Sequence, residues 1–137
     1  DFNTYRRDAM RILQEEAQLD EIVRLVGMDA LSARDRLTME AAKSIREDYL
    51  HQNAFHEVDT YASLQKQYKM LKLIIDCYHL SIAALEKSAD LQEILNIPAR
   101  EKIGRSKYIE EKDLADFDRI AADMKAQLGG LKAKETF

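Results

Sequence analysis

The segment from Leu64 to Leu85 carries the most regular hydrophobic pattern in the chain. Its apolar residues alternate spacings of four and three, which places them on one stripe of a long α-helix. A second apolar row widens this stripe beyond a coiled-coil seam, so the helix should be packed on more than one side. The first row is Leu64, Tyr68, Leu71, Ile75, Tyr78, Ile82 and Leu85, and the second is Leu73, Ile74, Cys77 and Leu80. We therefore predict a helix bundle around this central helix.

The rest of the chain contains few residues that interrupt helices. Its 137 residues include one Pro and four Gly, and 34% of them are charged. This composition favours an all-α fold with a heavily solvated surface, and the length is that of one domain. We expect residues 1–137 to form a single all-α domain, a compact helical bundle of about four to six helices.

Two helices are predicted before the central one. The first runs from Asn3 to Val26, with Asn3 or Thr4 as its N-cap and Gly27 ending it in a left-handed conformation. Its apolar stripe consists of Tyr5, Ala9, Ile12, Leu19, Val23 and Val26.

The second predicted helix runs from Ser32 to Leu50. The Ser32 side chain can accept the free backbone N–H of Asp35, and the carboxylate of Asp35 lies at the positive end of the helix dipole. The residues that this helix should bury are Leu37, Ala41, Ile45 and Tyr49.

Three more helices are predicted after the central one. The first of them, 89–95, must end near Asn96, because Pro98 disfavours helical geometry at the residue before it. Pro98 can then open a short helical turn over 99–103. The last helix begins at Asp113, and its inner face consists of Leu114, Phe117, Ile120, Ala121, Met124 and Leu128.

Two internal segments lack a helical period. Residues 51–60 and 104–112 are polar and are predicted to be loops. Asp59 or Thr60 is expected to cap the central helix. The tail, 131–137, is predicted to be mobile.

Charge and cysteine content argue against several classes of function. The 25 acidic and 21 basic residues form no basic block that would neutralise a row of phosphates, so we expect no nucleic-acid partner. Cys77 is the single cysteine and no Cys/His spacing resembles a metal site, which predicts a cytoplasmic protein without a metal ligand. No apolar run approaches the roughly 20 residues that cross a bilayer. The first residues have no signal-peptide form and no initiator Met, which indicates a piece of a longer protein.

No set of side chains predicts an autonomous enzyme. The four Gly do not form the phosphate-binding loop of a P-loop hydrolase. His51 and His56 are five residues apart across a predicted helix end, which fits no standard metal motif. Cys77 lies in mid-helix on the apolar side, where thiols are normally inert. The acidic pairs at 15–16 and 110–111 are flanked by basic residues at helical spacing, and we interpret them as solvated faces.

Two short segments remain as candidate functional sites. Gly27 to Asp35 reads on spacing alone as an ordinary helix corner with a Gly stop, a tight turn and a Ser cap. Gln52 to Phe55 reads on the same basis as a loop with an aromatic residue filling the gap beneath it. Spacing does not separate these structural interpretations from functional ones.

Taken together, several strings of the chain resemble the C-terminal helical domain of the catalytic A-type subunit, or alpha chain, of archaeal and bacterial V/A-type ATP synthases. The resemblance covers most of the chain and is strongest from Tyr5 to Leu73. Its strings are Leu13-Gln14-Glu15-Glu16, Ile22-Val23-Arg24-Leu25-Val26-Gly27, Asp29-Ala30-Leu31, Ile45-Arg46-Glu47-Asp48, Leu50, Gln52-Asn53-Ala54-Phe55 and Val58-Asp59-Thr60-Tyr61.

The resemblance implies a contact with the rotor at the helix corner. In the related F-type β subunit, this corner carries the sequence DELSEED and touches the central stalk. The residues in that place here are Asp29, Ala30, Leu31, Ser32, Ala33, Arg34 and Asp35. Ala30, Ala33 and Arg34 replace three acids of the pattern. The resemblance therefore implies steric pushing by a capped corner rather than a contact that rests on negative charge.

The resemblance also implies that the chain contributes to an adenine pocket. Phe55 matches the family's aromatic residue and would give one wall by stacking, with Gln52 helping to shape the loop. ATP or ADP phosphates and Mg²⁺ would be handled by a nucleotide-binding domain elsewhere in the full-length subunit. Implied partners are the B-type subunit and the central-stalk subunits, in a complex peripheral to the membrane that couples ATP synthesis or hydrolysis to rotation and ion transport. The fragment by itself is expected to be inactive.

A second hypothesis is a stand-alone helical interaction module. In that case the apolar stripe of the central helix would dock a partner helix and would be exposed in the folded monomer. The ATP synthase hypothesis predicts instead that this stripe is core.

Overall fold

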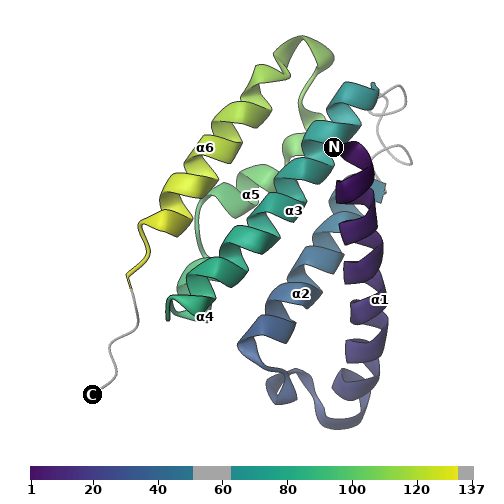
Figure 1. The fold of residues 1–137 in the computed structure, drawn as a ribbon, viewed down its shortest axis with the longest axis vertical. Helices are drawn as coiled ribbons and strands as arrows, with labels where there is room; N and C mark the ends of the chain where they lie inside the picture. The colour runs from purple at the N-terminus through teal and green to yellow at the C-terminus, as the bar shows by residue number, and fades with distance from the viewer. Residues whose placement is uncertain (51–62, 133–137) are drawn as a thin grey trace.

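A computed structural model of the chain describes residues 1–50 and 63–132 (Figure 1). All regular structure in these two ranges is helical, which confirms the all-α prediction. The α-helices are α1 (Phe2–Val26), α2 (Ala33–Ser44), α3 (Leu64–Glu86), α4 (Leu91–Leu95), α5 (Ala99–Gly104) and α6 (Ala115–Gly129). Short turns of other helical types are η1 (Met28–Ala30), η2 (Ile45–Leu50), η4 (Ser106–Tyr108) and η5 (Glu111–Asp113).

The helix α3 is the centre of the bundle, as its two apolar rows predict. It packs against α1 and α2 on one side and against α6 on the other, with α4 and α5 covering its C-terminal half (Figure 1). Both rows are therefore largely buried by the chain's own helices. This packing argues against the stand-alone module, which required the stripe to be exposed.

The beginning of α3 differs from the prediction. Ser63 is the N-cap, and its Oγ accepts the backbone N–H of Lys66 at 3.0 Å, so neither Asp59 nor Thr60 caps this helix. Leu64 is exposed although it belongs to the predicted stripe, because it lies in the first turn, where α3 extends past the N-terminus of α1 (Figure 1). The loop predicted over 51–60 lies outside the described residues.

The helix α1 begins one residue earlier than predicted. Asp1 caps it by accepting the backbone N–H of Asn3 at 3.1 Å, which leaves Asn3 and Thr4 inside the first turn. Ala9 and Ile12 of the predicted stripe are buried, but Val26 is exposed at the end of the helix. The other stripe residues, Tyr5, Leu19 and Val23, are half-buried.

The predicted helix from Ser32 to Leu50 is present but has two geometries. It is an α-helix to Ser44 and continues over Ile45–Leu50 as a π-helix, the segment η2. A π-turn contains more residues per turn than an α-turn, and hydrophobic spacing does not reveal it. Leu37, Ala41 and Ile45 are buried as predicted, and Tyr49 is half-buried.

The last third of the chain closes the bundle. Asn96 ends α4 and Pro98 precedes α5, as predicted, whereas the predicted loop 104–112 contains the turn η4 and the start of η5. The helix α6 begins at Ala115 rather than at Asp113, because η5 occupies the preceding residues. Leu131 packs against the core, so the tail is anchored at its first residue. The residues that α6 buries are Phe117, Ile120, Met124 and Leu128.

Candidate functional site

The corner between α1 and α2 is formed by a specific backbone conformation at its first residue. Gly27 ends α1 with φ 92° and ψ 165°, and its N–H donates to the carbonyl of Val23 at 2.9 Å. The positive φ is as predicted, but the ψ lies in the extended region rather than the left-handed helical one. Residues with a side chain rarely adopt this conformation, so glycine lets the chain leave α1 abruptly and enter η1.

Leu31 and Ser32 fix the other side of the corner. The side chain of Leu31 is buried, and its N–H donates to the carbonyl of Met28 at 3.1 Å. Ser32 then caps α2, because its Oγ accepts the backbone N–H of Asp35 at 3.1 Å. This is the predicted cap, and it satisfies one of the free donors at the start of α2.

The structure brings the predicted rotor-contact residues together at one end of the molecule, with different exposures. Asp29, Ala30, Ser32 and Arg34 are exposed, Ala33 and Asp35 are half-buried, and Leu31 is buried. Leu31 therefore holds the corner in shape and does not offer its side chain to a partner. Arg34 lies 3.7 Å from the carboxylate of Glu86, and both side chains are exposed, so this pair adds little stability.

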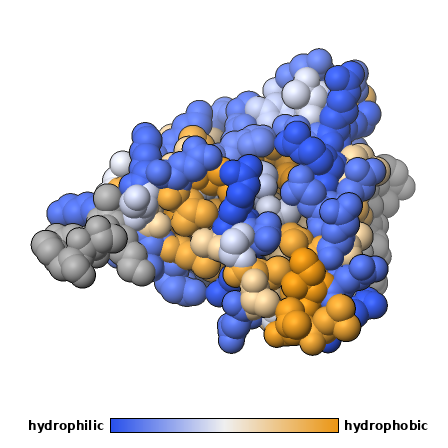
Figure 2. Space-filling view, turned by 60° about the horizontal axis from the view of Figure 1, so that its bottom comes forward, coloured by the Kyte–Doolittle hydropathy of each residue, from blue (hydrophilic) through white to orange (hydrophobic). Residues whose placement is uncertain are grey.

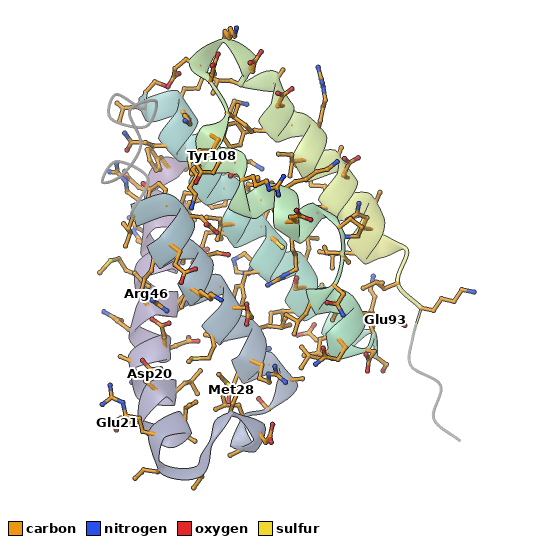
Figure 3. The ribbon with its side chains drawn as sticks, turned by 180° about the vertical axis from the view of Figure 1, so that it is seen from behind. Asp20, Glu21, Met28, Arg46, Glu93 and Tyr108 are labelled. Atoms are coloured by element: carbon orange, nitrogen blue, oxygen red, sulfur yellow. The ribbon has the colours of Figure 1, made fainter. Side chains whose placement is uncertain are left out.

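A group of exposed apolar residues adjoins the corner and was not predicted from the hydrophobic pattern. We call it the corner patch: Ile22, Leu25, Val26 and Met28, of which Leu25 is 83% and Val26 65% exposed. Figure 2 shows apolar side chains gathered on the end of the molecule that carries the corner, and Figure 3 places Met28 there, below Asp20 and Glu21 of α1. The signal was present in the sequence. Apolar residues over 22–26 surround the helix, and one stripe of a helix cannot bury them all.

Buried polar contacts connect the start of α2 to α3. The hydroxyl of Thr38 donates to the carbonyl of Arg34 at 3.2 Å and lies 2.9 Å from the hydroxyl of Tyr78. Thr38 and Tyr78 are both buried. Since buried hydroxyls are costly when unpaired, this contact holds the corner end of α2 in one position against α3.

The thiol of Cys77 is buried, as its sequence position predicts. It lies at the floor of a cavity of about 290 Å³ between α2, α3 and α5. Arg100 approaches the sulfur at 3.8 Å, but burial dominates and raises the pKa of the Cys77 thiol. A neutral, buried thiol is a poor nucleophile, so the cavity has no activated cysteine.

The two acidic pairs are not simple solvated faces. Glu16 is buried and forms a bidentate ion pair with Arg46 of η2, at 2.6 Å and 3.0 Å. Glu111 is exposed but accepts both the N–H and the hydroxyl of Ser63, at 2.8 Å and 2.7 Å. Helical spacing predicts neighbours on the same helix and cannot show these partners on other elements.

The other candidate residues give no further site. Gln52 and Phe55, the predicted adenine-pocket residues, lie outside the described residues, as do His51 and His56. Over 1–50 and 63–132, no group of three or more His, Cys, Asp or Glu side chains is placed to hold a metal ion. In these same ranges no helix is long and apolar enough to cross a membrane.

Comparison with known proteins identifies the family to which this fold belongs. Residues 1–95 match the family model for the C-terminal domain of V and A type ATP synthase, and the chain belongs to this family. Similar individual proteins are V-type ATP synthase alpha chains. That of Acetivibrio thermocellus is 60% identical over 98% of this chain, and that of Thermoanaerobacter pseudethanolicus is 60% identical over 96%. The corresponding chain of Clostridium perfringens is 56% identical over 96%.

The matches cover different parts of the molecules compared. This chain spans 23% of the length of the Acetivibrio thermocellus protein and 22% of the other two. Within this chain, the family model ends at residue 95, but the core does not. Ile103, Phe117 and Met124 belong to the same buried cluster as Leu71 and Ile75 of α3.

Proposed function

We propose that residues 1–137 are the C-terminal domain of the catalytic alpha chain of a V/A-type ATP synthase, and that the corner at 27–35 with the adjoining corner patch contacts the central stalk. In this role the domain moves with the nucleotide state of the subunit and pushes on the rotor during ATP hydrolysis. During synthesis the rotor drives the same movement in reverse. The complex is peripheral to the membrane on its cytoplasmic side and transports ions.

The observation that carries this proposal is an apolar, exposed patch beside a rigid corner. A surface that pushes on a partner must keep its shape, and Gly27, the buried Leu31 and the Ser32 cap give the corner one conformation. Exposed apolar side chains at the end of a helix are typical of a protein contact surface. Sequence reasoning favoured shape over acidity for this corner, and the exposure of Leu25 and Val26 supports that view.

The proposed nucleotide contact belongs to Phe55, with Gln52 in support. One aromatic wall does not hold a nucleotide tightly, so phosphate and Mg²⁺ binding belong to the rest of the catalytic chain, and the B-type subunit is the expected neighbour. We expect Phe55→Ala to weaken the affinity of the full-length subunit for ATP and ADP, measured by nucleotide titration of the assembled complex. An unchanged affinity would remove Phe55 from the pocket.

A cross-linking experiment tests the rotor contact. Ser32 is exposed at the corner, and the native Cys77 is buried, so a cysteine at position 32 can be joined selectively to a cysteine placed on the facing central stalk. The disulfide should stop ATP-driven rotation, and its reduction should restore rotation in the same sample. The Ser32→Cys subunit without a stalk cysteine serves as the control. Free rotation of the cross-linked complex would exclude this corner as the contact.

A further inference from the structure

The helical segment 33–50 connects the corner to the chain that follows Leu50. Its first part, α2, is held against α3 through Thr38 and Tyr78, and its last part is the π-turn η2. π-turns interrupt the regular hydrogen bonding of a helix and recur at functional sites. A lever that bends at such a turn would lose movement there, so the contacts that hold η2 decide whether 33–50 moves as one body.

The first of these contacts joins η2 to the middle of α1. Arg46 donates from Nε to Oε1 of Glu16 at 3.0 Å and from Nη2 to Oε2 at 2.6 Å. Glu16 is 8% exposed, whereas Arg46 is half-exposed. The hydrogen bond to Glu16 raises the pKa of the Arg46 guanidinium above its usual range. A bidentate pair with one buried partner fixes orientation as well as distance.

The second contact joins η2 to the turn η4. The ammonium of Lys107 lies 3.4 Å from Oδ1 of Asp48, and both side chains are largely buried. Burial raises the pKa of the Asp48 carboxyl, and the nearby Lys107 charge opposes that rise. Gly104 allows a close approach here, because a methyl group at its Cα would lie 3.9 Å from Oδ2 of Asp48.

The two contacts lie on different faces of the same turn. Residues two apart on a helix point in different directions, so Arg46 reaches α1 while Asp48 reaches η4. Any bend of η2 away from one partner must stretch at least one of the two pairs. Lys107 also lies beyond residue 95, outside the part of the chain that the family model matches.

We propose that Glu16 and Lys107 are positioning residues that clamp η2 from two sides and make the segment 33–50 a stiff connection, through which movement at the corner reaches the chain beyond Leu50. This inference rests on the proposed function of the corner. It assigns to two residues remote from the corner the task of keeping movement from being lost within the domain. They act through Arg46 and Asp48 and touch neither rotor nor nucleotide.

The test compares variants of the full-length subunit in the intact complex. Glu16→Gln weakens the first clamp, and its matched control is Glu15→Gln at the exposed neighbouring position. Lys107→Met removes the second, with Lys112→Met as the exposed control. Both clamp variants should lower the ions pumped per ATP hydrolysed by about two- to fivefold. Both controls should leave this ratio unchanged, and Lys107→Arg should restore most of it.

A merely structural role predicts a different result. If the clamps only stabilise the fold, the variants lower the melting temperature and total activity together while the pumping ratio stays normal, and that result overturns the inference. If a clamp variant does not assemble, the milder Arg46→Lys keeps the charge but loses the bidentate geometry, and a normal ratio in that variant also overturns it.

The corner itself separates this inference from the proposed function. A complex in which Leu25→Asp lowers the pumping ratio while the clamp variants do not retains the proposed function and overturns the inference. A complex in which neither change lowers the ratio overturns both.

Discussion

Leu31 illustrates how one residue can be essential to a contact surface without touching the partner. Its neighbours Ala30 and Ser32 are exposed, yet the Leu31 side chain is buried under the corner. The resemblance to the F-type sequence places Leu31 within the contact motif but does not say which way its side chain points. The contacts proposed for the motif therefore belong to its exposed residues and to the corner patch beside it.

At the same scale, Glu111 should make stability depend on acid pH. The N–H and hydroxyl of Ser63 hold the pKa of Glu111 below its usual range. A carboxyl with a lowered pKa in the folded state stabilises fully above its unfolded pKa of about 4.3, and this contribution is lost as the pH falls through the folded pKa. We expect Glu111→Gln to lower the urea midpoint at pH 7 and to lose less stability than the parent protein on acidification.

The matched control for this prediction is Glu110→Gln. Glu110 pairs with Lys112 on the surface, where an ion pair contributes little. Equal acid dependence in the parent protein and in Glu111→Gln would mean that the contact with Ser63 contributes no stability.

At the scale of elements, the Ser32 cap should carry a measurable part of the stability of α2. Ser32→Ala removes the acceptor for the N–H of Asp35, and such a loss costs about 1 kcal/mol. Ser32→Asp keeps an acceptor at the same place and should retain most of the stability. Chemical denaturation of the three proteins measures the difference, and identical midpoints for the parent protein and Ser32→Ala would show that water replaces the cap without cost.

The elements also show which features of this fold are predictable. Hydrophobic spacing located α1, α2, α3 and α6, because each buries one face against the core. Local chemistry located the Ser32 cap and the Pro98 start of α5. The π-turn, the Asp1 cap and the partners of Glu16 and Glu111 escaped, because they depend on which surfaces meet in space.

The candidate site was predictable in the same uneven way. The position of the corner followed from Gly27 and Ser32, whose roles are local. The corner patch was not anticipated, because Val26 fits the buried stripe by spacing and only the place where α1 ends exposes it. The adenine-pocket residues Gln52 and Phe55 remain predictions.

At the scale of the whole molecule, the part that the family model matches should not fold without the rest. The family model ends at residue 95, yet α6 covers the face of α3 that includes Leu73 and adds Phe117 and Met124 to the same core. Removing residues 96–137 would expose this face, and exposed apolar surface of that kind leads to loose packing or aggregation. We expect residues 1–95 alone to bind hydrophobic dyes and to lack a cooperative thermal transition.

The parent chain is the control for that experiment. It should melt cooperatively, because its buried residues form one connected cluster from Ala9 to Leu128. A cooperative transition for residues 1–95 would show that α5 and α6 are an accessory layer on an already stable bundle.

The π-turn at 45–50 has a consequence for chain length. A π-helix fits one more residue into a turn than an α-helix does, so removing one residue from this segment would allow ordinary α-helical bonding to continue through it. The chain leaving residue 50 would then point about 100° away from its present direction, the rotation of one α-helical residue. Single-residue deletions here should therefore be far less tolerated than substitutions, and the length of this segment matters as much as its composition.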